Sequence, residues 1–152
     1  MPRYFTVAEA ERVLPEVERA LRDALFHKDE AVEAQRELNR TSERIRALGG
    51  MRVNPAELMA VRARLEASAV ALKAAMEQVE ELGAQIKDLE IGLIDFLSRF
   101  RDRDVWLCWK LGESRIGFWH GLEEGFRGRK PIDREFLEGH GSKNGGSPER
   151  LN

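Results

Sequence analysis

Apolar residues that recur at heptad spacing constrain the fold of this chain more than any other sequence feature. One series lies between Ala10 and Ile45, and a second lies between Leu58 and Leu82. This spacing places apolar side chains along one face of an α-helix. Gly49-Gly50 separates the two series, and glycine readily ends a helix. We therefore predict an antiparallel, coiled-coil-like helical hairpin over residues 6–83.

Both predicted helices have recognisable starts. Thr6 is followed three residues later by Glu9, which is the spacing of a capping box. Asn54 precedes Pro55, a residue that suits the first position of a helix. Pro15 falls inside the first helix, where it either kinks that helix or begins a new one.

The two helices differ in length. The first has about 42 residues and the second about 28, or roughly 63 Å and 42 Å at 1.5 Å per residue. If the two helices pair from their glycine link, the first helix extends beyond the second. The extension carries Val13, Leu14 and Val17, so another part of the chain must cover it. Within the chain, only the segment after Gly83 can do so.

After Gly83 the pattern changes to short apolar runs. Residues 92–96, 105–111 and 115–120 have the composition of strands, and residues 112–114 suit a hairpin turn. We therefore predict an α+β fold in which a small antiparallel β-sheet packs at one end of the helical hairpin.

We predict one domain over residues 1–138. It consists of the helical hairpin, residues 6–83, and a small β-module, residues 84–132. Residues 139–152 are rich in Gly, Ser and Asn, so we expect a flexible C-terminal tail there.

The register of the predicted hairpin decides which side chains share a face. If Leu111 lies opposite Ser114, Trp106 and Trp119 pair on one face of the sheet. The other face then carries Leu107, Trp109, Ile116, Phe118 and His120. A slip of one residue reverses this arrangement, and the sequence leaves both registers open.

The composition restricts the partners. Lys and Arg number 25 against 27 Asp and Glu, for a net charge of −2, and nucleic-acid-binding domains normally carry a basic excess. We therefore do not expect nucleic acid as a partner. A single cysteine excludes an internal disulfide and suits a reducing compartment. No apolar run approaches the roughly 18 residues of a membrane span, so we expect a cytoplasmic protein without membrane contact.

A metal site is one interpretation of the acidic and histidine residues in the β-module. His120 with Asp95, Glu113 and Glu123 supplies the donors that Zn, Mn or Fe use, and Cys108 would favour Zn. The alternative is that His120 hydrogen-bonds a backbone carbonyl and the acids are turn or surface residues. A single histidine outside an HxH or HExxH pattern does not decide between them.

Cys108 has two interpretations as well. A free cysteine in a strand is usually a small buried apolar residue. Nucleophilic chemistry requires His120 beside it, whereas the register that pairs Leu111 with Ser114 places Gly117 there instead.

Aromatic and basic residues suggest a binding surface. Trp106, Trp109 and Trp119 either form a platform for a ligand or fill the core, and at least one is expected near the surface. Arg129 lies in a basic run that either binds an anion or is neutralised by nearby acids. We take Trp106, Trp119 and Arg129 as candidates for a ligand or partner surface.

The chain resembles a small bacterial family of unassigned function, the DUF2203-like domain of unknown function, between Phe5 and about Ile132. The shared pattern consists of Thr6, Glu9 and Ala10; Asp88 and Leu89; Gly92 to Phe96; Leu107 to Glu113; and Trp119, His120, Glu123, Gly125 and Phe126. The resemblance implies no activity.

Two functions fit these features. The first is a binding or structural module that forms a homodimer through its helices, with a ligand or partner site at the β-end. The second is a metal-dependent enzyme, hydrolytic in type, in which metal-bound water is the nucleophile.

Overall fold

The computed structural model describes residues 3–49 and 54–141. The chain divides into two compact units. The helical unit is Ala20–Glu77, and the sheet unit consists of Met1–Arg19 together with Gln78–Asn152. Our predicted boundary lay between residues 83 and 84.

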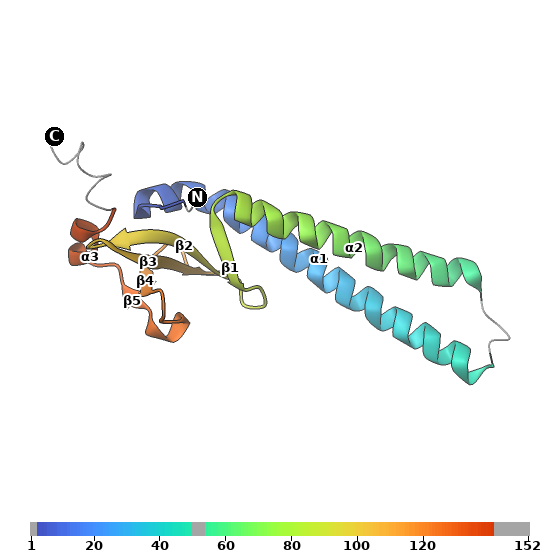
Figure 1. Ribbon diagram of the computed structural model, residues 1–152. Coiled ribbons are helices and arrows are strands. Elements are labelled where there is room, and N and C mark those ends of the chain that lie inside the picture. Colours follow the sequence, from blue (N-terminus) through green and yellow to red (C-terminus); the bar gives the residue numbers. More distant parts are fainter. Residues whose placement is uncertain (1–2, 50–53, 142–152) are drawn as a thin grey trace. The chain divides into compact units, whose positions relative to one another are not determined.

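The helical unit contains most of the predicted hairpin, whose two ends, residues 7–19 and 78–81, belong to the sheet unit. Helices α1 (Val7–Ala47) and α2 (Pro55–Glu81) pack against each other, which confirms the α+β prediction for this part of the chain (Figure 1). Its most buried side chains are small or aliphatic, with one threonine: Ala20, Leu21, Ala24, Ala34, Thr41 and Val61. The small side chains allow the two helix backbones to approach closely.

The predicted helix caps are formed. Thr6 Oγ1 accepts from the Glu9 amide at 3.1 Å, and Glu9 Oε1 accepts from the Thr6 amide at 2.9 Å. Asn54 Oδ1 accepts from the Ala56 amide at 3.0 Å. Helix α1 continues through Pro15 as a single element.

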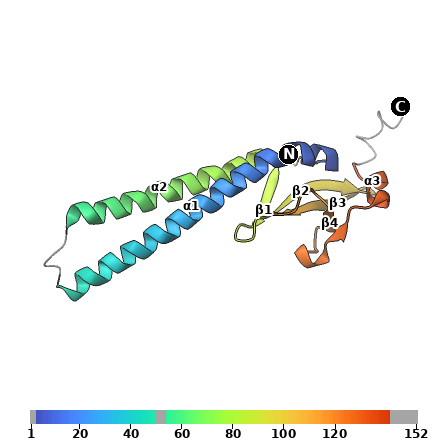
Figure 2. The ribbon, with the colours of Figure 1, turned by 180° about the vertical axis from the view of Figure 1, so that it is seen from behind.

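The sheet unit contains one five-stranded antiparallel sheet in which the spatial order follows the chain order. The strands are β1 (Ala84–Asp88), β2 (Leu93–Phe100), β3 (Arg103–Lys110), β4 (Phe118–Gly121) and β5 (Lys130–Pro131). Figure 2 shows β1 to β4 of this sheet. The short helices are η1 (Phe126–Gly128) and α3 (Arg134–Gly139). The sequence predicted the three central strands and missed β1, β5 and α3.

The N-terminal segment of the sheet unit packs on one face of this sheet. The Phe5 ring lies 5.0 Å from the Phe96 ring, and the Phe5 amide donates to the Leu97 carbonyl at 2.7 Å. Glu11 accepts from the Ile116 amide at 2.7 Å. Leu14 of the predicted extension is buried. The prediction that the β-module covers the start of the first helix is therefore confirmed.

Gly83 makes this packing possible. Its φ is +107°, a conformation that other residues rarely adopt, and a Cβ there would lie 2.2 Å from the Phe5 ring. The chain therefore passes directly from α2 into β1 at Gly83, which lies against the Phe5 ring.

The hairpin register differs from the one that would pair Leu111 with Ser114. Strand β3 pairs Trp106 with His120 and Leu107 with Trp119. Trp106 and Trp119 therefore lie on opposite faces of the sheet and do not pair. Phe118 and His120 likewise lie on the face opposite Leu107. A one-residue slip in the turn reverses every side chain of the strand.

The first residues of the expected tail are hydrogen-bonded to the sheet. His140 forms a bridge with Phe100, and the Gly141 amide donates to the Arg99 carbonyl at 3.0 Å. The rest of that segment, 142–152, lies outside the described residues. Among the helices that the structure describes, none is long and apolar enough to cross a membrane.

Candidate metal centre

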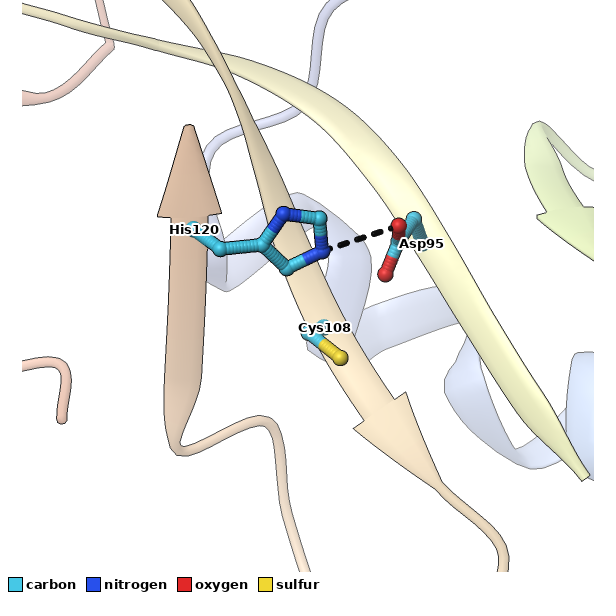
Figure 3. A group of neighbouring side chains, drawn as sticks. All are labelled: Asp95, Cys108 and His120. Atoms are coloured by element: carbon cyan, nitrogen blue, oxygen red, sulfur yellow. Dashed lines mark hydrogen bonds and ion pairs between the residues drawn. The ribbon is translucent and has the colours of Figure 1, made fainter. Parts of the chain in front are cut away.

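Three side chains that can bind a metal meet on one face of the sheet. Asp95 comes from β2, Cys108 from β3 and His120 from β4 (Figure 3). Asp95 lies directly opposite Cys108, and His120 lies opposite Trp106 on the same face. Within residues 3–49 and 54–141, they form the one group of three or more His, Cys, Asp or Glu residues that is close enough for a metal ion.

The three residues are buried and close together. Their exposed fractions are 1% for Asp95, 0% for Cys108 and 4% for His120. His120 Nε2 lies 3.0 Å from Asp95 Oδ2. One potential ligand atom from each residue lies within 4.8 Å of the other two.

The hydrogen bonds of His120 determine where its protons lie. Nδ1 is 2.9 Å from the Gly121 carbonyl oxygen, which only accepts hydrogen bonds, so Nδ1 carries a proton. The contact of Nε2 with Asp95 therefore needs a second proton, held by one of these two groups. A metal ion bound at Nε2 would replace that proton, and the bond from Nδ1 to a carbonyl is the usual support for a metal-binding histidine.

Burial changes the acidity of the other two groups. It raises the pKa of Asp95 above its usual value, although His120, Cys108 and Lys87 act in the opposite direction. Burial and the neighbouring Asp95 carboxylate raise the pKa of Cys108 to about 12. Without a metal, the cysteine is therefore a thiol at neutral pH and a poor nucleophile.

One oxygen of this group lacks a normal hydrogen bond. Among the described residues, Asp95 Oδ1 is buried without a hydrogen-bond partner of ordinary geometry, as is Ser98 Oγ. The thiol of Cys108 is near Asp95 but is a weak donor. An unsatisfied buried carboxylate oxygen is costly, and a cation would compensate for it.

Zinc binds nitrogen, oxygen and sulfur ligands at about 2.0–2.3 Å. The three side chains would have to adjust to hold it, because His120 Nε2 and Asp95 Oδ2 are 3.0 Å apart and the three potential ligand atoms lie within 4.8 Å of one another.

A small pocket opens beside Asp95 and His120. Its volume is about 130 Å³, and charged, apolar and aromatic residues line it. The lining residues other than Asp95 and His120 are Lys87, Leu93, Trp106, Leu122, Glu124, Gly125 and Phe126. The pocket therefore gives a small molecule access to Asp95 and His120, two of the three grouped residues.

The two other predicted metal ligands lie outside this group of three. Glu113 accepts from the Lys110 amide at 2.9 Å and forms an ion pair with Arg129 at 2.9 Å. Glu123 is exposed in the turn after β4. The group thus contains Asp95 and His120 from the predicted set, together with Cys108.

The predicted surface residues have different environments. Trp106 is half-buried and lines the pocket. Trp119 lies on the opposite face, 5.0 Å from the Phe100 ring and 4.9 Å from the Phe136 ring.

Arg129 is held in place by several contacts. Its guanidinium lies over the rings of Phe118, at 4.0 Å, and Phe126, at 4.3 Å. Nη1 is also 4.0 Å from Cys108 Sγ. Arg129 therefore packs on the same face of the sheet, next to the three-residue group.

A protein family described as "Uncharacterized conserved protein (DUF2203)" matches residues 3–132. No curated protein and no solved structure matches the chain. The chain belongs to the DUF2203 family, as the motifs of the β-module indicated.

Proposed function

We propose that this DUF2203 protein binds one zinc ion through Asp95, Cys108 and His120, and that zinc-bound water performs a hydrolytic reaction in the adjoining pocket. The observation that carries the proposal is the meeting of three different metal-binding groups, all buried, on neighbouring strands. This geometry favours the enzymatic interpretation of the β-module over a binding module without a metal.

The competing interpretation is a structural role for the same residues. A buried histidine that hydrogen-bonds an aspartate and a carbonyl is satisfied without a metal. That interpretation explains His120 but leaves Asp95 Oδ1 without a partner among the described residues. It also gives no reason to bury a carboxylate at this position, where its desolvation is unfavourable.

The ligand types favour zinc over manganese or iron. Thiolate is a soft ligand that suits zinc, whereas manganese prefers carboxylates and water. Bound zinc also stabilises a thiolate, so the raised pKa of Cys108 in the metal-free protein does not prevent coordination. Three protein ligands with a fourth position open to a small molecule is the arrangement of catalytic zinc sites.

Hydrolysis is the reaction class that such a centre supports. Asp95, Cys108 and His120 would hold the ion, which would supply a Lewis acid that makes a hydrolytic water more acidic. In the hydrolysis of an ester or amide, the oxygen of this water bonds to the carbonyl carbon. The bond from this carbon to the leaving group breaks, and the leaving group takes the proton that the water released.

Zinc binding to the full chain tests the proposal. Isothermal titration and metal analysis of the wild type are expected to give about one zinc per chain, whereas Cys108→Ser and His120→Ala are expected to lose the site. Glu123→Gln is the matched control, because it changes an exposed acid three residues from His120 and should retain zinc. Circular dichroism verifies that each variant is folded.

Two results would contradict the proposal. One is a folded wild-type protein that binds no zinc under titration. The other is zinc that remains bound with unchanged affinity in both the Cys108 and His120 variants. Hydrolytic activity is then sought with a panel of aryl esters, with the zinc-free protein and Cys108→Ser as references.

A second proposal concerns the helical unit, and a specific observation supports it. Phe26, Met59 and Val70 are 60%, 68% and 65% exposed, respectively. A two-helix hairpin buries little apolar surface by itself, and two hairpins can associate into a four-helix arrangement. We propose that the partner is a second copy of this chain.

Sedimentation equilibrium tests this second proposal. The wild type is expected to be a dimer, and the double variant Phe26→Glu/Val70→Glu is expected to be a monomer with unchanged helix content. A monomeric wild type across the micromolar range would contradict it, without any bearing on the zinc site.

A further inference from the structure

The pocket beside the proposed zinc site has an uneven distribution of charge. Among its lining residues, Glu124 pairs with Lys130 at 2.6 Å and also accepts from the Gly121 amide at 2.7 Å. Asp95 belongs to the three-residue group. Lys87 is the remaining charged lining residue.

Lys87 has no ion pair among the residues that the structure describes. Its Nζ lies 4.1 Å from the centre of the Trp106 ring and donates to Gln85 Oε1 at 3.4 Å. Lys87 is exposed, and these contacts place its ammonium group beside the pocket without neutralising its charge. Its field also reaches the site, because it lowers the pKa of Asp95 against the effect of burial.

The charges of the occupied site do not cancel that of Lys87. Zinc bound by one carboxylate, one thiolate and one neutral imidazole is electrically neutral overall. Lys87 therefore leaves the pocket with an excess positive charge. A ligand with a single negative charge would balance it while filling the open position on zinc.

The size and walls of the pocket restrict that ligand further. A volume of about 130 Å³ has room for roughly four water-sized groups, at about 30 Å³ each. Its apolar walls are formed by Leu93, Trp106, Leu122 and Phe126. The occupant is therefore small, singly charged at one end and apolar at the other.

We propose that the pocket binds a short-chain carboxylate, whose carboxyl group contacts both the zinc ion and Lys87 and whose alkyl part lies against Trp106 and Phe126. This proposal rests on the zinc site of the proposed function. Hydrolysis of an ester or amide of a short-chain acid releases such a carboxylate, so the pocket identifies the acyl group of the substrate. Acyl groups of about two or three carbons fit the volume.

Replacing zinc with cobalt allows carboxylate binding to be measured by visible absorption. The visible absorption of cobalt changes when a ligand enters its coordination shell. Acetate and propionate are titrated into the cobalt-loaded full-length protein, with hexanoate as the larger comparison. Saturable spectral changes are expected for acetate and propionate, and much weaker ones for hexanoate.

Lys87→Met tests the charge contact, and Lys73→Met is its matched control. Lys73 is exposed on α2, in the other unit. Lys87→Met is expected to keep stoichiometric cobalt and to weaken propionate binding about tenfold, the effect of losing one hydrogen bond to a charged group. Lys73→Met is expected to bind both cobalt and propionate as the wild type does.

The outcomes separate the two proposals. Stoichiometric cobalt without a carboxylate-induced spectral change would overturn the short-chain carboxylate and leave the zinc site standing. Propionate binding that is equal in Lys87→Met and Lys73→Met would overturn the role of Lys87. Failure of the wild type to bind either metal would overturn the proposed function, and this inference with it.

Discussion

The helical unit and the sheet unit bury different kinds of side chain. The buried residues of the helical unit are alanines and aliphatic residues, with Thr41 as the polar exception. The sheet unit buries an apolar core of the same kind and, in addition, Asp95, Ser98, His120 and Cys108. Apolar burial is sufficient to stabilise a small unit, and buried polar groups oppose folding unless they are paired.

The difference supports the proposal that the functional site lies in the sheet unit. The buried side chains of the helical unit include no ionisable group among the described residues. The sheet unit retains a carboxylate, a thiol and an imidazole in positions that apolar side chains could fill at lower free energy. Such groups are typical of a site that binds or transforms a ligand.

The largest expected effect is on the stability of the apolar core, which both units contain. Leu21 in the helical unit and Leu107 in the sheet unit are both fully buried. Leu21→Ala and Leu107→Ala should each lower the free energy of unfolding by about 2–5 kcal/mol, because each leaves a cavity in a packed core. Urea denaturation measures both. Leu137, 47% exposed, is the control, and Leu137→Ala should change stability by less than about 0.5 kcal/mol.

The second prediction concerns the sheet unit alone and tests whether Asp95 binds zinc. In Asp95→Asn, the amide can donate to His120 Nε2, so the metal-free variant should be at least as stable as the wild type. Zinc at a hundred times its dissociation constant should stabilise the wild type by about 2.7 kcal/mol. Zinc should leave the stability of Asp95→Asn unchanged. Thermal unfolding with and without zinc measures this difference, and equal stabilisation of both proteins would exclude Asp95 as a ligand.

Proton release sharpens the same contrast. Zinc must displace the proton of the Cys108 thiol, whose pKa is about 12. Binding near pH 7 should therefore release at least this proton, and the apparent affinity should increase with pH. Calorimetry in buffers of different ionisation enthalpy counts the protons that are released. Binding without proton release would place the metal elsewhere.

The smallest expected effect lies at the rim of the pocket. The Lys130 ammonium and the Gly121 amide lower the pKa of Glu124. The folded state therefore favours the charged form. Its contribution to stability is present above the unfolded pKa and is lost as the pH falls through the lowered value. Glu124→Gln should be slightly less stable than the wild type near neutral pH, and the two should converge in acid, as followed by urea denaturation across pH.

The helices could be predicted because their signals are local. The bonds of Thr6 with Glu9 and of Asn54 with Ala56 join residues two or three positions apart. The same reasoning missed β1 and β5. Strand β1 has Ile86 as its one large apolar residue, and β5 contains Pro131, which is unusual in a strand.

The candidate site could be predicted only in part, because it depends on strand register. Asp95 and His120 were both candidate metal ligands from their chemistry, together with Glu113 and Glu123. Their relation to Cys108 depends on a turn in which Glu113 accepts bonds from the Trp109 indole and the Lys110 amide. Those contacts cannot be read from spacing. A one-residue difference in this turn separates a cysteine beside Gly117 from one grouped with His120 and Asp95.

X-ray absorption spectroscopy of the zinc-loaded, full-length protein tests the central claim most directly. The predicted zinc shell contains one sulfur at about 2.3 Å and nitrogen and oxygen atoms at about 2.0–2.2 Å. The sulfur should be absent from any zinc bound by Cys108→Ser. A wild-type shell of nitrogen and oxygen alone would contradict the claim that Cys108 and its neighbours on the sheet form the metal centre.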